Sequence, residues 1–287
     1  MGLDPTQRDA EYLGRVVDRI SRVYGPKGWF GLDVTGWEHV PAPPTLLVSN
    51  HSGGTSIPDV WGLMVAWTRH FGVHRPVHPL AHDMVFSVPA VARRFARLGV
   101  LRAAPGMGYE VLTRHRRDLF VCPGGDRETW RTWKDRYKVQ FFGRTGYARL
   151  ALRAGVPVLP IAHAGAQHSF LVLSDGARLA RTLHLPQLFR AEVFPVHLSL
   201  PWGLAVGPLP HLPLPVLMRY RIGPIVPFPA GARPGEEPTL EVVQTYDAAV
   251  RAAIQGLLDE LRETEAPLRA RVREVVGRVS GRTQPPR

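Results

Sequence analysis

The stretch TLLVSNHSGGTSIPDVWGLMVAWT, residues 45–68, passes from an apolar run through a polar loop into a second apolar run. Residues 45–49 have the length and composition of a buried strand. Residues 50–58 contain two glycines and a proline and predict a loop, and residues 59–68 predict a helix. A strand that leads through a short loop into a helix is the building unit of a parallel sheet. This stretch therefore favours an α/β fold.

Working outward, short apolar strands continue to alternate with helices. The pattern predicts helices and strands in turn at 87–98, 100–102, 108–115, 119–122, 145–154 and 156–161. The alternation weakens beyond residue 194, where we expect strands near 204–206 and 218–222. The predicted class is α/β, with a mainly parallel central sheet flanked by helices.

Amphipathic helices are predicted at both ends of this core. Asp4 and Pro5 can start an N-terminal helix that Gly25-Pro26 ends, and Thr239 can cap a long helix that runs to Leu261. Pro267 then begins a more basic helix. We predict a single domain over 1–287, with a core at about 40–230 and a helical C-terminal segment at about 236–281.

Composition narrows the possible partners. The 287 residues carry a formal charge of +12, and only three of the 36 basic residues are lysines. Such a surface suits nucleic acid, anionic lipid headgroups or a phosphorylated small molecule, although an arginine bias of the coding DNA explains it equally well. No nucleic-acid-binding signature is present, so we expect no nucleic-acid partner. The lone Cys122 excludes an intramolecular disulfide and favours a reducing compartment.

Three long stretches, 39–58, 154–174 and 193–218, contain no Asp, Glu, Lys or Arg. The last is long enough to span a bilayer, but its six prolines exclude a regular helix. We therefore predict no transmembrane helix. The irregular apolar segment 193–218 could instead rest in a membrane interface or wrap over the core.

The loop after the first strand is the densest group of chemically active residues. His51 can accept a proton near neutral pH, and a carboxylate such as Asp59 can hold its tautomer. Gly53 and Gly54 allow backbone N–H groups to approach a developing oxyanion. The alternative is that His51 merely caps a helix or packs in the core.

Three further groups of polar residues lie next to predicted strands or helices. The segment Pro123-Gly124-Gly125-Asp126-Arg127-Glu128 comes directly after an apolar strand, so it faces the same crevice or forms a tight turn. Arg144 precedes a predicted helix and weakly resembles an anion site. His163 and His168 lie after a strand and either line the pocket or play no part.

Other site classes lack support. There is no G-x-S-x-G nucleophile elbow, Walker A loop or dinucleotide-binding G-x-G-x-x-G. His70, His74, His78 and His82 are spaced as on one helical face, but Pro76 and Pro79 interrupt that helix, so we predict no metal site.

Four blocks together resemble the lysophospholipid, or glycerolipid, acyltransferase superfamily. The first is N-H-S-G-G-x-x-x-P-D at 50–59, and the third is P-G-G-D-x-E at 123–128. Phe95, Gly99 and Arg102 are similar to the second block, and 156–160 to the fourth. The closest likeness is to a bacterial branch with an NHSGG first block and a third block like that of diacylglycerol acyltransferases.

The resemblance implies a membrane-associated O-acyltransferase that needs no metal or cofactor. It also implies a cytoplasmic protein bound peripherally to the inner face of an anionic membrane, with 193–218 as an interfacial segment or a cover over an acyl chain. Acyl-CoA or an acyl carrier protein would donate the acyl group to a lipid hydroxyl, with His51 as general base and Asp59 as its partner. The residues that the resemblance and the loop chemistry assign to substrate binding are Gly53, Gly54, Arg102, Gly124, Gly125, Asp126, Arg127, Glu128 and Arg144.

Two departures from the family pattern leave alternatives open. The family separates its His and Asp by four residues, whereas seven separate His51 from Asp59, so Asp126 or Glu128 could be the partner instead. The third block lacks the Glu-Gly-Thr-Arg of enzymes that act on lysophosphatidate, which favours a neutral acylglycerol or alcohol as acceptor. Nearby basic residues keep a phosphorylated acceptor, or the phosphates of CoA, open; they are Arg127, Arg131, Lys134 and Arg144.

Two other functions remain as alternatives to acyl transfer onto a neutral lipid hydroxyl. One is a non-catalytic lipid-binding relative, and the other is a hydrolase of acyl thioesters. The acyl chain length and the oligomeric state are not indicated by the sequence.

Overall fold

A computed structural model describes residues 2–25, 28–104, 106–185, 187, 192–266, 270, 276 and 277. Its central sheet has seven strands in the order β1-β10-β6-β2-β5-β3-β4. Neighbouring strands are parallel except β10 and β6, which are antiparallel. The predicted α/β class with a mainly parallel sheet is thus confirmed. The strands are β1 Gly31–Thr35, β2 Leu46–Ser49, β3 Val77–Ala81, β4 Leu101–Arg102, β5 Asp118–Val121, β6 Val158–Ala164 and β10 Leu217–Ile222.

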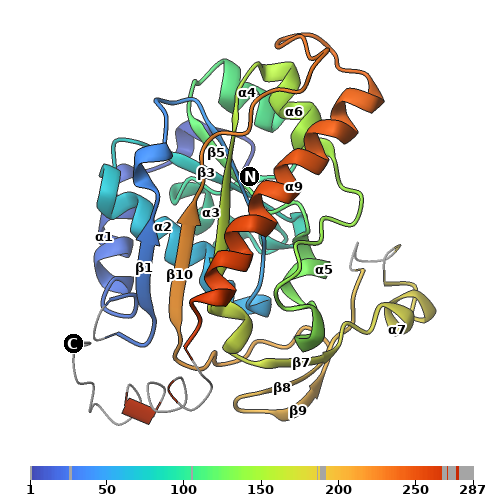
Figure 1. Cartoon of the computed structure of the whole chain (residues 1–287). Helices are drawn as coiled ribbons and strands as arrows, with labels where there is room; N and C mark the ends of the chain where they lie inside the picture. Colours follow the sequence, from blue (N-terminus) through green and yellow to red (C-terminus); the bar gives the residue numbers. More distant parts are fainter. Residues whose placement is uncertain are drawn as a thin grey trace.

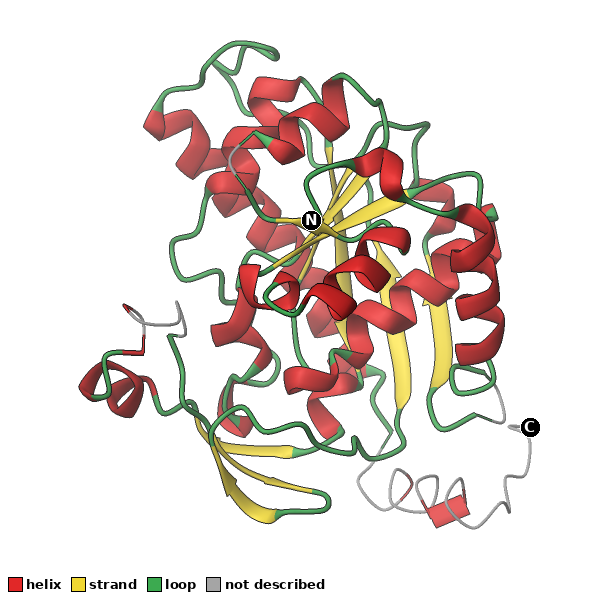
Figure 2. Ribbon diagram, turned by 180° about the vertical axis from the view of Figure 1, so that it is seen from behind, coloured by secondary structure: helices red, strands yellow, loops and turns green. Residues whose placement is uncertain are grey.

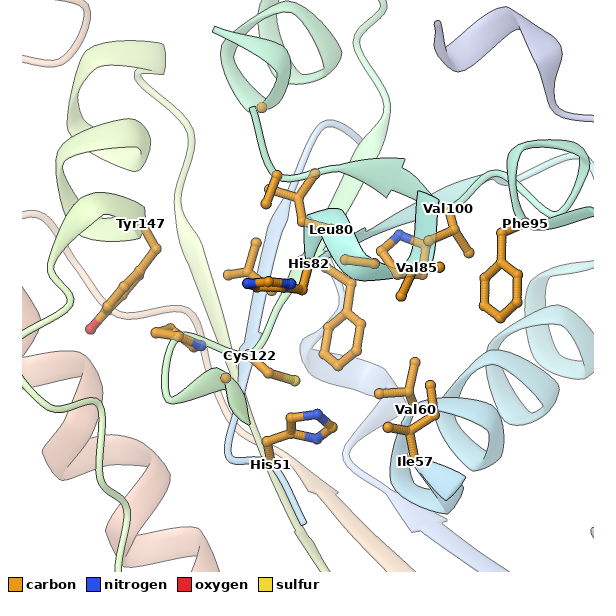
Figure 3. A pocket seen from close by; sticks show the side chains of 18 of the residues that line it. His51, Ile57, Val60, Leu80, His82, Val85, Phe95, Val100, Cys122 and Tyr147 are labelled. Carbon is orange, nitrogen blue, oxygen red and sulfur yellow. The ribbon is translucent and has the colours of Figure 1, made fainter. Parts of the chain in front are cut away.

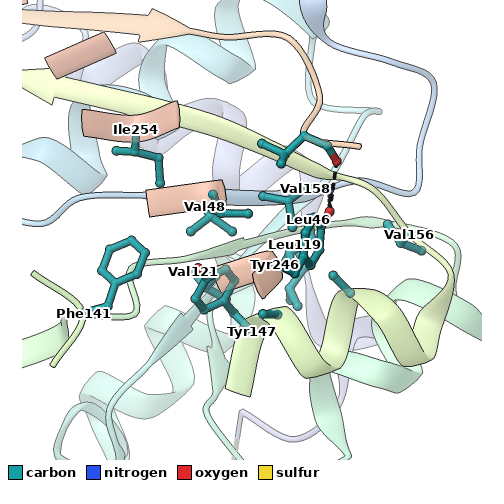
Figure 4. Packing of buried hydrophobic residues seen from close by; sticks show 14 of the residues in the cluster. Leu46, Val48, Leu119, Val121, Phe141, Tyr147, Val156, Val158, Tyr246 and Ile254 are labelled. Atoms are coloured by element: carbon teal, nitrogen blue, oxygen red, sulfur yellow. Dashed lines mark hydrogen bonds between the residues drawn. The ribbon is translucent and has the colours of Figure 1, made fainter. Parts of the chain in front are cut away.

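Helices cover both faces of this sheet (Figures 1 and 2). Successive side chains of a strand point to opposite faces, so Leu46 and Val48 pack with α4, α6 and α9 while Leu47 packs with α1 and α2. Figure 4 shows the first of these cores, in which the Tyr246 hydroxyl donates to the Val226 carbonyl at 3.1 Å. The helices are α1 Ala10–Ile20, α2 Pro58–Phe71, α3 Pro89–Arg97, α4 Met107–Thr113, α5 Gly125–Thr129, α6 Gly146–Ala154, α7 Ala177–Thr182 and α9 Leu240–Glu263.

The ends of the chain differ in part from the prediction. Asp4 caps only a short 3-10 turn, and α1 starts afresh at Ala10, because the Asp9 carboxylate accepts from the Tyr12 N–H at 2.8 Å. Thr239 caps α9 as predicted. The basic helix predicted from Pro267 lies almost entirely outside the described residues.

Several elements were not predicted from the sequence. Strand β3 was missed because His78 and Pro79 interrupt its apolar pattern. A second sheet of three antiparallel strands, β7 Leu171–Ser174, β8 Val196–Ser199 and β9 Gly203–Val206, projects beside α5 and α7 (Figure 1). Of these three strands, β9 confirms the strand predicted near 204–206, whereas β7 and β8 were not predicted. Of the helices in the described part of the chain, none combines the length and the apolar character needed to cross a bilayer.

Candidate active site

The candidate site lies where three neighbouring strands end. His51 follows β2, Gly124 and Gly125 follow β5, and His163 lies near the end of β6. These strands are adjacent and parallel, so their carboxyl ends meet at one edge of the sheet. That edge is where open α/β sheets bind their ligands.

His51 and Asp59 remain in contact although seven residues separate them, compared with four in the acyltransferase family pattern. Their side chains meet with Nδ1 and Oδ2 2.6 Å apart, and the Ser52 N–H donates to the same oxygen at 3.0 Å. The chain accommodates the additional residues as a short 3-10 turn, Gly54–Ser56. Gly53 enters this turn at φ +105°, a left-handed conformation that favours glycine. Asp59 then lies in the first turn of α2, facing back to the imidazole.

Burial and charge together set the protonation of this pair. Asp59 is 2% exposed and His51 12% exposed at their side chains. Burial disfavours the imidazolium, but the adjacent Asp59 carboxylate outweighs it and raises the pKa of His51. Burial likewise opposes ionisation of Asp59, yet His51 and His163 lower the pKa of its carboxyl group. Because Nδ1 faces the carboxylate, Nε2 is the nitrogen free to take a proton from a substrate.

A second histidine, His163, contacts the residues around the His51–Asp59 pair. His163 is almost fully buried, its Nε2 lying 2.7 Å from Ser52 Oγ and 3.5 Å from Asp59 Oδ2. Asn50 fixes its position, since the Asn50 amide exchanges hydrogen bonds of 3.0 and 2.9 Å with the His163 backbone. Burial lowers the pKa of His163 to about 4, so its ring is neutral near pH 7. His163 is therefore placed to orient Ser52 and Asp59.

The third predicted block contributes through its buried Glu128. The Glu128 carboxylate accepts from the His51 N–H and the Gln140 N–H, each at 3.1 Å. It also pairs with Arg131 at 3.1 Å, with side-chain exposures of 0% for Glu128 and 3% for Arg131. Burial raises the pKa of Glu128 to about 7 despite the opposing charge of Arg131. Glu128 thus fixes the backbone of the loop that carries His51.

The three carboxylates proposed as partners of His51 have different contacts. Asp59 bonds the imidazole itself, whereas Glu128 bonds only the backbone of His51. Asp126 instead bonds Arg144 Nη2 at 3.1 Å. Asp59 is therefore the only one of these three side chains that bonds the imidazole.

A cavity of about 840 Å³ adjoins His51. Figure 3 shows the His51 ring in this cavity beside Cys122. Burial raises the pKa of the Cys122 thiol, so it stays protonated and is poorly suited as a nucleophile. One part of the lining is apolar and comes from α1, α2 and α3, including Val17, Ile20, Val60, Trp61, Met64 and Phe95.

A polar part of the cavity holds several of the predicted binding residues. Gly125, Asp126 and Arg144 line it, together with Arg149 and Arg153 of α6, which the sequence did not single out. Gly125 adopts φ +53°, which favours glycine, and a Cβ there would lie 2.3 Å from Arg144 Nη1, so that the Arg144 side chain would have to move. Each arginine has an acidic partner, because Arg144 pairs with Asp126 and Glu192 while Arg149 and Arg153 share Glu237.

Two predicted binding residues are engaged elsewhere. Arg102 bonds Asp83 Oδ1 at 2.6 Å, and Arg127 lies over the Phe142 ring at 3.8 Å. Neither is among the residues that line the cavity. The structure therefore does not bring Arg102 and Arg127 to the His51 side of the site.

The spaced histidines do not share a helical face. His70 lies on α2, His74 in the following loop, His78 on β3 and His82 ahead of the next 3-10 turn. Over the residues that the structure describes, no three His, Cys, Asp or Glu side chains gather as a metal site would require.

The α/β sheet thus places a histidine bonded to a carboxylate beside a partly apolar cavity. Residues 31–164 match the sequence model of the family described as Acyltransferase. Over these residues, just under half of its length, the chain is similar to that acyltransferase family.

Proteins of known sequence are also similar to this chain. An uncharacterized protein of Mycobacterium tuberculosis is 29% identical over 256 residues, which is 87% of this chain and 68% of that protein. A chicken protein named "DGAT1/2-independent enzyme synthesizing storage lipids" is 24% identical over 80% of this chain and 60% of its own length. Its human counterpart is 28% identical over 64% of this chain and 56% of its own.

One solved structure is also similar. It is the 1-acyl-sn-glycerophosphate (LPA) acyltransferase PlsC from Thermotoga maritima, which matches with a TM-score of 0.49 and 18% identity. The match covers 90% of this chain and 80% of that one.

Proposed function

We propose that this chain moves a fatty acyl group from an acyl thioester to a lipid hydroxyl, with His51 as the general base. The observation that carries the proposal is the His51–Asp59 pair at 2.6 Å on the edge of a largely apolar cavity. The apolar part suits an acyl chain, and the polar part with Arg144 suits the phosphates of a CoA or carrier-protein donor.

The reaction follows from the free nitrogen of His51. Nε2 takes the proton of the acceptor hydroxyl as its oxygen attacks the thioester carbonyl carbon. A C–O bond forms, and the carbonyl oxygen carries the negative charge of a tetrahedral intermediate. When the C–S bond breaks, the thiolate leaves and takes the proton from His51. The steps need no covalent acyl-enzyme, metal or cofactor.

The acceptor that we propose has a neutral headgroup, such as an acylglycerol or a long-chain alcohol. Arg131, one of the basic residues that could bind a phosphate, is buried against Glu128 and is not among the residues that line the cavity. Support also comes from the name of the chicken relative, which refers to storage lipids. Arg144, Arg149 and Arg153 line the cavity and favour a second candidate, a phosphorylated acceptor such as lysophosphatidate.

Radiolabelled acyl-CoA offered with a panel of acceptors distinguishes these candidates. The panel contains monoacylglycerol, diacylglycerol, a fatty alcohol, lysophosphatidate and a lysophospholipid. We expect labelled neutral lipid to be the main product on a chromatogram. Labelled phosphatidate as the main product would reject the neutral acceptor. Free fatty acid released without any acceptor would indicate a hydrolase, and acyl-CoA binding without turnover a non-catalytic relative.

The pH dependence of the rate tests the role of Asp59. Acyl transfer requires neutral His51, so kcat/KM should fall as pH drops through the pKa of His51, which Asp59 raises. In Asp59→Asn the carboxylate is lost while burial remains. The pKa of His51 should then fall, and the acidic limb of the profile should move to lower pH.

The same variant should also lose rate on the alkaline plateau, by an expected ~10²–10⁴-fold, because the imidazolium and its tautomer are no longer stabilised. The profile is measured with acyl-CoA and the best acceptor of the panel. An acidic limb that stays at the wild-type pH would show that Asp59 does not set the pKa of His51. The other charges around the ring, Glu128 and Arg131, are unchanged in this variant.

A further inference from the structure

The small sheet formed by β7, β8 and β9 carries apolar side chains on its outer face. Register pairs Leu198 with Leu204 and Val196 with Val206, so these four residues share one face. Leu198, Leu204 and Val206 are 42%, 65% and 49% exposed. The opposite face, with His197 and Ala205, is buried. We call Leu198, Leu204 and Val206 the apolar face.

More exposed apolar residues surround this face. Leu200, Trp202 and Leu212 are 48%, 53% and 54% exposed, and the Leu200 and Leu212 backbones are paired. The Trp202 indole N–H donates to the Pro210 carbonyl, so its polar group is satisfied while its ring stays exposed. Scattered exposed apolar residues are normal on a protein, but a contiguous group of this kind marks an interaction site.

The neighbouring charges indicate what the face contacts. Residues 193–218 contain no charged side chain, whereas α7, next to β7 in sequence, exposes Arg178 and Arg181. Leu179 of α7 and Leu183, which caps the end of this helix, are also exposed, at 39% and 45%. Exposed apolar side chains flanked by arginines fit the boundary of an anionic lipid bilayer.

The apolar face is also connected to the catalytic loop. Thr55 Oγ1 donates to the Leu209 carbonyl at 3.2 Å, and Ser56 Oγ donates to the His211 carbonyl at 2.9 Å. Both hydroxyls belong to the turn between His51 and Asp59. Of the described residues that line the cavity, none falls within 193–218, so this segment does not cover the acyl-chain part of the site.

We propose that the β7–β8–β9 sheet docks this enzyme on an anionic membrane through the apolar face, with Arg178 and Arg181 contacting lipid headgroups. This inference rests on the proposed lipid acceptor and names the surface that reaches it. Docking there brings the His51 loop next to the bilayer, so an acceptor lipid has only a short path to the cavity. Figure 1 shows this sheet and α7 projecting together beyond the central sheet.

The test compares two triple variants of the full chain. The first is Leu198→Thr, Leu204→Thr and Val206→Thr, in which threonine keeps the preference for strands. The matched control is Val23→Thr, Val88→Thr and Leu240→Thr, whose residues are 40%, 53% and 60% exposed on other elements. Binding is measured by sedimentation with vesicles of phosphatidylcholine and phosphatidylglycerol, and circular dichroism shows whether each variant is folded.

We expect the first variant to partition onto vesicles at least about tenfold more weakly than wild type, because three apolar side chains lose their burial in lipid. The control variant should bind as wild type. Arg178→Gln with Arg181→Gln should weaken binding by about fivefold per arginine on anionic vesicles and leave binding to pure phosphatidylcholine unchanged.

Two results would overturn the proposal. One is equal vesicle binding by wild type and the first triple variant. The other is a change of molar mass in light scattering with no change in vesicle binding, which would make the face a contact between copies of this chain. Vesicle binding needs no turnover, so an inactive wild type that still shows these differences would reject the proposed function and leave the docking surface in place.

Discussion

Replacing His51 by alanine is expected to abolish acyl transfer, with a loss of about 10²–10⁴-fold or more in kcat. The Nε2 nitrogen is the proposed proton acceptor, and His163 is not placed to replace it, because its ring is buried and bonded to Ser52. The acceptor hydroxyl would then have to attack with its proton in place. The loss is measured with labelled acyl-CoA and the best acceptor.

His82→Ala is the matched control for this loss. His82 also lines the cavity, but it is exposed and serves only to cap a short turn through the Met84 N–H. We expect that variant to keep near wild-type activity. Wild-type turnover by a folded His51→Ala protein would remove the general-base mechanism altogether.

Replacing Glu128 by glutamine is expected to destabilise the fold by about 3–5 kcal/mol at a pH well above the Glu128 pKa of about 7, because it leaves the buried Arg131 charge without the carboxylate that it bonds. Arg131 is 6% exposed, and its Nε and Nη2 atoms already lack hydrogen-bond partners. The variant also loses a carboxylate oxygen that accepts from the His51 N–H. Chemical denaturation measures the change in the free energy of unfolding.

Two further variants isolate the buried charge as the cause. Adding Arg131→Met to Glu128→Gln removes the unpaired cation, so part of the stability should return. Asp135→Asn breaks the exposed pair with Lys138, whose side chain is 61% exposed, and should change the free energy of unfolding by less than about 1 kcal/mol. Equal destabilisation by the single and double variants at 128 and 131 would argue against an unpaired charge.

Local patterns in the sequence were sufficient to predict the framework of the site. The apolar run at 46–49 and the breakers that follow it predict a strand, a loop and a helix without reference to the rest of the chain. Because parallel strands end at one edge, the loops after β2 and β5 could be placed together as well. His51 and the 123–128 segment were therefore found from sequence.

Contacts between distant segments were not accessible in the same way. The apolar wall of the cavity includes Val17 and Ile20 of α1, which the sequence identifies only as one side of an amphipathic helix. The burial of Glu128 depends on the path of the chain from β5 through α5. Arg102 contacts an acidic residue and Arg127 an aromatic one, and neither arginine lines the cavity. Such partners depend on packing rather than on spacing.

The sequence by itself determined the α/β class, the position of His51 at the end of a strand and the resemblance to acyltransferases. Only the tertiary structure decided that Asp59 is the carboxylate bonded to the imidazole, because the left-handed turn at Gly53 absorbs the additional residues of the loop. It also decided which side of 193–218 faces outward. Alternation along a strand divides residues into two sets, but packing against the rest of the molecule selects the set that is buried.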